Sequence, residues 1–160
     1  MRCANSQDEF KMAQIILVFT NAGALVLQSE NITSGTIIFD DTQPNAVPKS
    51  LADSRKDILV LDGGLVNLPG FNPHFRFGLL HREDMWGCLA ETIILSWLKD
   101  QEGYEYTDFS EDEKKVTEAY ERAYKATGFR VASMRGFSRY RLKEDTIEKI
   151  RDLISVDIRS

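Results

Sequence analysis

Three short apolar runs, each closed by polar or turn-forming residues, constrain the fold of this chain more than any other feature. They occupy residues 15–20, 36–40 and 58–62. Continuous apolar runs of this length are typical of parallel strands that are covered on both faces of a sheet. Each run ends in Thr or Asp, and open α/β sheets bind ligands at the carboxyl ends of their parallel strands. The first half is therefore predicted to form a parallel sheet with a ligand-binding edge.

Helical patterns follow in the second half of the chain. Apolar side chains recur every four positions over residues 85–99, which predicts a largely buried helix. Ser110 and Glu113 form a capping box, which predicts a second helix that ends at Gly128. A last amphipathic helix is expected over residues 145–154. The fold class is therefore α/β, with a sheet followed by a helical part.

These patterns divide the chain into two parts, with the sheet at residues 1–84 and the helices at residues 85–160. A complete dinucleotide-binding domain opens with a strand and the motif G-x-G-x-x-G leading into a helix. The sequence contains no such motif, and too few residues precede the first apolar run for a complete βαβ unit. We therefore expect either that the chain does not bind a dinucleotide or that it is the later part of a longer protein.

Composition excludes several classes of function. The chain has 20 basic and 25 acidic residues, a net charge of −5, which argues against a nucleic-acid binder. No apolar run reaches the roughly 18–20 residues that span a bilayer, and the first residues lack the apolar core of a signal peptide. Cys3 and Cys88 are the only cysteines, so no disulfide framework is expected and the cytoplasm is the expected location. The cysteines and histidines show no zinc-binding spacing, so no metal site is expected.

Cys88 is the leading candidate for chemistry, because it lies where the chain enters the first predicted helix. A thiol in the first turn is close to unpaired N–H groups and the positive end of the helix dipole, and both favour the nucleophilic thiolate. The alternative is an ordinary buried thiol. Glu91, one turn later, either positions the thiol and carries a proton or is a structural first-turn carboxylate, and we favour the structural role.

Three further features have both a functional and a structural interpretation. His81 lies seven residues before Cys88 and is a candidate base, with an exposed loop histidine as the alternative. Gly63 and Gly64 either make a turn that needs a positive φ or let a cofactor approach the backbone. The basic stretch 130–141 is either a solvated surface or a docking site for an acidic carrier protein or a phosphopantetheine arm.

Five segments of the sequence, in this order, carry a resemblance to a known family: 18–22, 35–41, 60–66, 87–95 and 127–129. Their order and spacing resemble the carboxyl-terminal half of long-chain acyl-[acyl-carrier-protein] reductases. These are Rossmann-type enzymes related to the shikimate dehydrogenase and glutamyl-tRNA reductase group. The resemblance covers roughly residues 15–130, and its most specific part is the Cys-x-Ala-Glu run downstream of the Gly-Gly turn.

The resemblance implies an incomplete Rossmann-like sheet and a two-step reduction. Cys88 would take an acyl group from a thioester of acyl carrier protein or coenzyme A, and NADPH or NADH would then deliver hydride and release a fatty aldehyde. Glu91 and His81 are the candidates for proton transfer at this site. The resemblance also places a set of residues along the cofactor edge: Thr20, Asn21 and Ala22 after the first strand, Asp40 after the second, and Asp62, Gly63 and Gly64 after the third.

An alternative class of function stays open. The chain would then be an inactive fragment or a non-catalytic Rossmann-like module, which binds a partner or forms a homo-oligomer through apolar surface left open. In either case we expect weak cofactor binding by this chain, because the pyrophosphate normally rests on the glycine loop and the helix N-terminus that follows it.

Overall fold

The computed structural model describes residues 6–20, 27–75, 77–104, 113–137 and 140–141, together with positions 145, 148 and 152. Two compact units make up the chain: unit 1 contains residues 1–63 and 134–160, and unit 2 contains residues 64–133. The sequence patterns had placed a boundary at residues 84/85 instead. The predicted cap at Ser110 and most of the predicted last helix lie outside the described residues.

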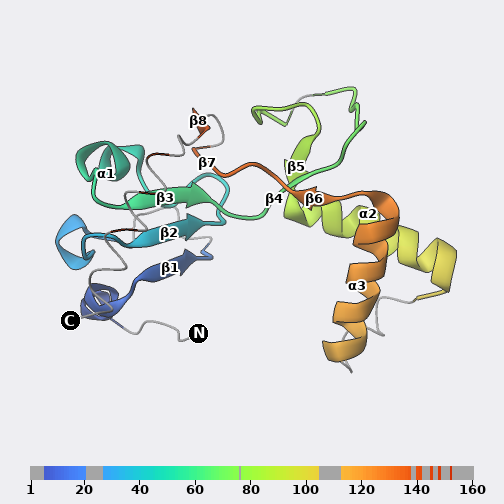
Figure 1. Ribbon diagram of the computed structural model, residues 1–160, viewed down its shortest axis with the longest axis horizontal. Coiled ribbons are helices and arrows are strands. Elements are labelled where there is room, and N and C mark those ends of the chain that lie inside the picture. The colour runs from blue at the N-terminus through green and yellow to red at the C-terminus, as the bar shows by residue number, and fades with distance from the viewer. Residues whose placement is uncertain are drawn as a thin grey trace. The chain divides into compact units, whose positions relative to one another are not determined.

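Unit 1 contains the predicted parallel sheet (Figure 1). Its strands are β1 (Ile15–Val18), β2 (Ile37–Asp40) and β3 (Leu59–Asp62), hydrogen-bonded in the order β1-β2-β3 and all parallel. The register aligns Val18, Asp40 and Asp62. The prediction of an α/β fold with a three-stranded parallel sheet is therefore confirmed, and two of the predicted edge residues lie side by side at its carboxyl end.

Short helices and loops cover one face of this sheet. They include two 3₁₀ helices, η1 (Gln7–Met12) and η2 (Ser29–Asn31), and one short α-helix, α1 (Lys49–Ser54). The core on this face joins alternate strand residues to side chains from the loops and α1: Ile16, Val18, Leu27, Ile32, Ile38, Val47, Leu51, Ile58 and Val60. Alternation along the strands places the residues between these on the opposite face.

A two-stranded antiparallel ribbon completes the described part of unit 1. It consists of β7 (Arg135–Gly136) and β8 (Tyr140–Arg141). Backbone packing against β3 is close here, because a Cβ added at Gly136 would lie 2.8 Å from the carbonyl oxygen of Val60. Part of the basic stretch 130–141, which has no regular pattern in the sequence, therefore forms a ribbon that packs against β3.

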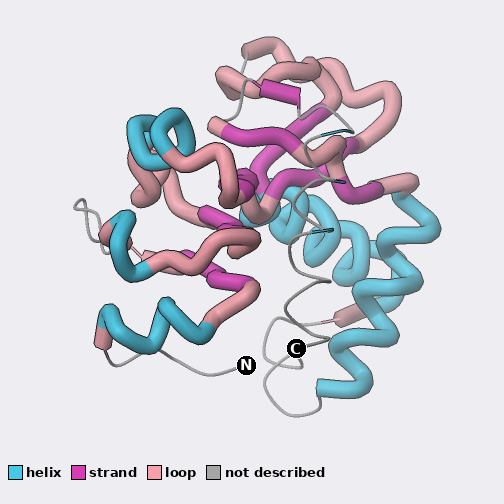
Figure 2. The backbone as a smooth tube through the Cα atoms, turned by 60° about the vertical axis from the view of Figure 1, so that its left-hand side comes forward, coloured by secondary structure: helices cyan, strands magenta, loops and turns pink. Residues whose placement is uncertain are grey.

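Unit 2 combines a small antiparallel sheet with two helices. The strands are β4 (Leu65–Asn67), β5 (Asp84–Trp86) and β6 (Arg130–Val131), in the order β5-β4-β6. The helices are α2 (Gly87–Glu102) and α3 (Glu113–Thr127), which pack side by side (Figure 2). The expectation of a helical segment from residue 85 onward is corrected at β5 and β6, which form strands.

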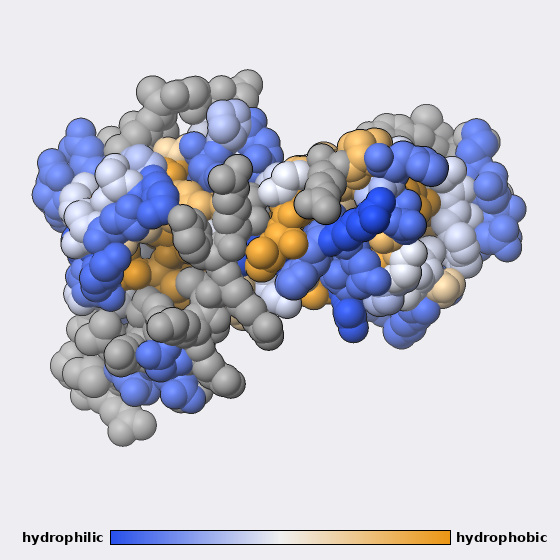
Figure 3. Space-filling model, turned by 90° about the horizontal axis from the view of Figure 1, so that it is seen from above, coloured by the Kyte–Doolittle hydropathy of each residue, from blue (hydrophilic) through white to orange (hydrophobic). Residues whose placement is uncertain are grey.

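The helices of unit 2 bury the apolar stripes that the sequence predicted. The core consists of Met85, Ala90, Ile94, Leu98, Ala119, Ala123 and Phe129. On the outer surface of unit 2, apolar groups lie next to strongly hydrophilic side chains (Figure 3). In the described part of the chain, no helix has both the length and the apolar character needed to cross a membrane.

Candidate functional site

Cys88 occupies the second position of α2, and its side chain is exposed. Trp86 is the N-cap residue and contributes no side-chain cap, and the first turn of the helix contains no acidic residue. The thiol therefore lies among N–H groups that have no partner within the helix, near the positive end of the dipole. The exposed position differs from the buried thiol that was the alternative interpretation.

A close backbone contact fixes the start of this helix. The N–H of Gly87 donates to the carbonyl oxygen of Gly64, with 2.5 Å between N and O. A Cβ at Gly87 would lie 2.9 Å from that oxygen, so the contact requires glycine. Gly64 itself has φ +61°, a conformation that glycine adopts without strain. Gly64, one of the residues predicted along the cofactor edge, therefore contacts the helix start beside Cys88.

The two other predicted catalytic residues lie in different surroundings. The hydroxyl of Tyr120 donates to Oε1 of Glu91 at 2.9 Å, which connects α2 to α3. This contact favours the structural role for Glu91. His81 is exposed on the loop that enters β5, whereas Cys88 follows the other end of that strand. The structure therefore does not bring the imidazole of His81 to the thiol.

Asp40, at the end of β2, is 1% exposed and is held by its own loop. Its Oδ1 accepts from the hydroxyl of Thr42, and its Oδ2 accepts from the N–H of Val47 at 2.8 Å. The amide of Asn45 donates to Oδ2 of Asp40 at 3.4 Å and to Oδ1 of Asp62 at 3.3 Å. Asp40 thus supports the loop after β2 and presents no free acceptor to a ligand at the edge.

Asp62 and Gly63 of the predicted cofactor edge also make local contacts. Oδ1 of Asp62 accepts the backbone N–H of Phe137 at 2.7 Å. A side chain at Gly63 would place its Cβ 2.8 Å from the Cβ of Asp41, so the glycine is required by packing. Partial burial, and then the neighbouring charge of Asp40, raise the pKa of Asp41. Thr20 follows β1 and is half-buried, and positions 21 and 22, the other two predicted edge residues, lie outside the described residues.

The residues of the predicted basic cluster belong to both units, and one of them is buried. Arg130 is an exposed residue of β6 in unit 2, whereas Arg135 belongs to β7 in unit 1 and is 1% exposed. Position 139 lies outside the described residues. The expectation of a solvated basic patch or carrier dock is therefore corrected at Arg135, whose burial removes it from the surface.

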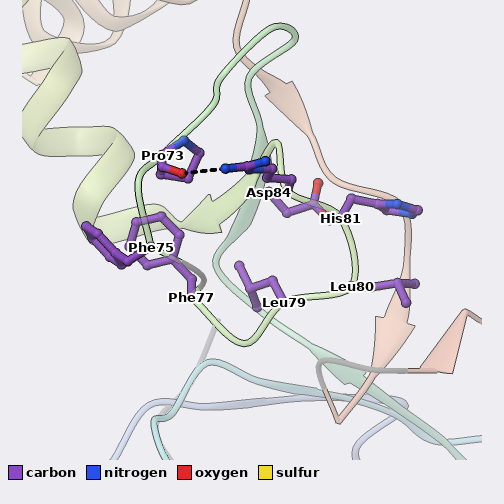
Figure 4. A pocket seen from close by; sticks show the side chains of 8 residues that line it. Pro73, Phe75, Phe77, Leu79, Leu80, His81 and Asp84 are labelled. Carbon is purple, nitrogen blue, oxygen red and sulfur yellow. Dashed lines mark hydrogen bonds between the residues drawn. The ribbon is translucent and has the colours of Figure 1, made fainter.

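The sequence patterns did not identify two neighbouring cavities in unit 2. One has a volume of about 180 Å³ and is lined by apolar and charged side chains of the loop before β5 (Figure 4). The other, of about 420 Å³, includes Asn67 and Arg130. Both cavities share His81, Arg82 and Asp84. Among the described residues, no group of three or more His, Cys, Asp and Glu side chains is placed to hold a metal ion.

Comparison with known proteins adds no identification. No protein-family model matches the chain, and no solved structure matches it significantly. The candidate site is therefore defined by its own geometry: an exposed thiol at the start of α2, beside the Gly64 turn, with Glu91 held by Tyr120.

Proposed function

We propose that this chain accepts an acyl group from a thioester on the sulfur of Cys88, as the first step of an NAD(P)H-dependent reduction of a fatty acyl thioester to an aldehyde. The observation that carries the proposal is the exposed thiol at the second position of α2. The Cys-Leu-Ala-Glu run that contains it is also the most specific part of the resemblance to acyl-[acyl-carrier-protein] reductases.

The geometry supports acyl transfer in the following way. The thiolate of Cys88 attacks the carbonyl carbon of the thioester, the bond from that carbon to the carrier sulfur breaks, and the carrier leaves as a thiol with the proton that Cys88 released. First-turn N–H groups of α2 can donate to the carbonyl oxygen as it gains negative charge. The first turn has no acidic residue, and the next acidic side chain of the helix, Glu91, is held by the hydroxyl of Tyr120.

The cofactor half of the reaction has less support from the structure. A nicotinamide cofactor, when bound, supplies the hydride that turns the acyl-enzyme into an aldehyde and frees the thiol. The described edge residues do not fit this group, because Asp40 is buried with both carboxylate oxygens committed to its own loop. The chemistry proposed for this chain's own residues is therefore the acyl transfer to Cys88, and the reduction is what the resemblance implies.

The experiment that tests the proposal separates these two halves. The chain is incubated with a long-chain acyl-CoA, or with an acylated carrier protein, and its intact mass is measured. We expect a gain equal to one acyl group, lost in Cys88→Ser and retained in the matched control Cys3→Ser. An adduct that persists in Cys88→Ser would overturn the proposal. Adding NADPH or NADH separately to the acylated chain, with trapping of any aldehyde, then tests the reductive half.

A second candidate function is self-association through β1. Ile15 and Leu17 of this edge strand, and Phe19 just after its end, alternate with buried residues and are 58%, 43% and 67% exposed. Parallel sheets are normally covered on both faces, and an exposed apolar edge strand favours pairing with another chain. We propose a second copy of this chain as the partner. Light scattering would then show a dimer that Leu17→Lys dissociates and the control Gln14→Lys does not. A dimer without acylation favours this function over the first.

A further inference from the structure

The loop between β4 and β5 in unit 2 closes on itself. Its ends are joined, because the N–H of Leu68 donates to the carbonyl oxygen of Glu83 at 2.9 Å. The N–H of Gly70 donates to Oε1 of Glu83 at 2.8 Å, which fastens the loop a second time. A loop whose ends meet in this way is packed by its own side chains, and such loops are frequently functional.

The smaller of the two cavities lies inside this loop. The rings of Phe75 and Phe77 meet edge to face, with centroids 4.7 Å apart, and line the cavity together with Leu79 and Leu80 (Figure 4). Its volume of about 180 Å³ is close to the roughly 150 Å³ of an apolar cavity that binds benzene. By volume it therefore has room for a group of about six carbon atoms.

The larger cavity contains a guanidinium held by a buried polar row. Nε of Arg130 donates to Oδ1 of Asn67 at 2.8 Å, and Nδ2 of Asn67 donates to Oδ1 of Asp84 at 2.8 Å. Asn67 is 8% exposed and Asp84 1%, so the row is a fixed part of the fold. Because Nε already donates to Asn67, the N–H groups at the two terminal nitrogens of Arg130 are the ones that can donate to a ligand in the cavity.

The lining of the larger cavity combines Arg82 and Arg130 with the carboxylates of Glu83 and Asp84, and those carboxylates are already held by the N–H of Gly70 and the amide of Asn67. Arg82, which lines both cavities, donates from Nη2 to the carbonyl oxygen of Pro73 at 3.1 Å. In the part of the chain that the structure describes, neither Arg82 nor Arg130 forms an ion pair with an acidic side chain. Glu83 accepts instead from a backbone N–H. Two guanidinium groups beside one cavity complement a carboxylate, which arginine binds through parallel hydrogen bonds.

We propose that these adjoining cavities bind a small amphiphilic carboxylate, with its short alkyl group among the phenylalanine and leucine side chains and its carboxylate at Arg130 and Arg82. The two cavities share His81, Arg82 and Asp84 and therefore adjoin, and the proposed ligand would span both. The site does not include Cys88 and is independent of acyl transfer to that residue.

The test is a titration of the whole chain with hexanoate, followed through backbone amide NMR signals. We expect shifts concentrated at residues 73–84 and 130–133. Affinity should exceed that for acetate by at least about tenfold, because several methylene groups become buried. Hexylammonium and 1-hexanol have the same alkyl group without the negative charge and should bind at least about tenfold more weakly.

Variants assign the two halves of the ligand. Arg130→Gln should weaken hexanoate binding about tenfold, and Arg130→Lys should restore only part of it, because lysine lacks the fork. Arg122→Gln is the matched control, since that arginine pairs with Glu102 on the surface of the same unit. Leu80→Ser should weaken the binding of hexanoate but not of acetate.

Three outcomes would overturn the inference: hexylammonium binding as tightly as hexanoate, shifts that lie outside these residues, or equal affinities of Arg130→Gln and Arg122→Gln. Should Arg130→Gln fail to fold, Arg82→Gln provides the same comparison, because its contact to the Pro73 carbonyl lies in an exposed loop.

Discussion

Arg130 and Asn67 face each other across the register of β4 and β6, and Nε of Arg130 lies 2.8 Å from Oδ1 of Asn67. On its other side, Asn67 is paired in register with Asp84 of β5 and donates to it. An amide suits this central position, because it accepts from the guanidinium and donates to the carboxylate at the same time. The row connects all three strands of the unit 2 sheet through side chains.

The first prediction concerns this central amide. Asn67→Ala removes both hydrogen bonds and should lower the free energy of unfolding by about 1–3 kcal/mol. Asn67→Asp keeps the shape but places a second carboxylate beside buried Asp84, so it should be more destabilising at pH 7 than Asn67→Ala. Urea unfolding measures both, with the exposed Asn72→Ala as control. Equal stability of Asn67→Ala and Asn72→Ala would contradict a structural role for the row.

The parallel sheet could be predicted from the sequence because each of its strands is a continuous apolar run. The strands of unit 2 could not, because they are two or three residues long, too short for any period to appear. The pairing of Asn67 with Arg130 joins residues 63 positions apart. No local sequence pattern predicts a contact between residues so far apart, so the cavity beside this contact could not be predicted either.

The candidate site was predictable to the extent that it depends on local chemistry. The position of Cys88 at a helix start follows from the apolar stripe of α2, which begins there. The role of Asp40 depends instead on Asn45 and Val47, which a loop returns to the end of β2. The sequence pattern of an acidic residue at a strand end is the same whether its carboxylate binds a ligand or the following loop. The role of Asp40 could therefore be assigned only from the structure.

The second prediction concerns the contact between Gly64 and the start of α2. In Gly87→Ala the new Cβ would lie 2.9 Å from the carbonyl oxygen of Gly64, so the helix start or the turn must shift. Overpacking of this kind typically destabilises by about 1–3 kcal/mol. Thermal unfolding of Gly87→Ala, compared with the exposed α2 control Ser96→Ala, measures the effect. A variant as stable as the control would show that the turn relaxes freely.

The third prediction concerns acid sensitivity in unit 1. The hydrogen bond from the Arg55 guanidinium is the main cause that lowers the pKa of Asp57 from 3.8 to about 2. Because the folded pKa is depressed, this stabilisation is present above about pH 4 and is lost as the pH falls toward 2. Asp57 is 37% exposed, so after allowance for solvent screening we expect about 1 kcal/mol.

Asp57→Asn tests this expectation through urea unfolding across that pH range. Its difference from the unsubstituted chain should be largest at neutral pH and disappear near pH 2. Asp53→Asn is the control, because Asp53 pairs with Lys49 at an exposed position and should change stability little. A difference between Asp57→Asn and the unsubstituted chain that does not vary with pH would assign the effect to packing rather than to charge.

The fourth prediction concerns the reactivity of Cys88. Because its thiol is exposed at the start of α2, iodoacetamide should label it in the folded chain at pH 7. The helix dipole contributes about 0.3–1 kcal/mol, so Cys88 should react faster than Cys3 by no more than about fivefold.

Glu91→Gln removes a negative charge one turn away and should raise the rate at which Cys88 is labelled about twofold, while Glu118→Gln on α3 should not. Peptide mapping at successive times gives these rates. Labelling of Cys88 only after denaturation would mean that the thiol is inaccessible, and the assignment of Cys88 as the acyl acceptor would then fail.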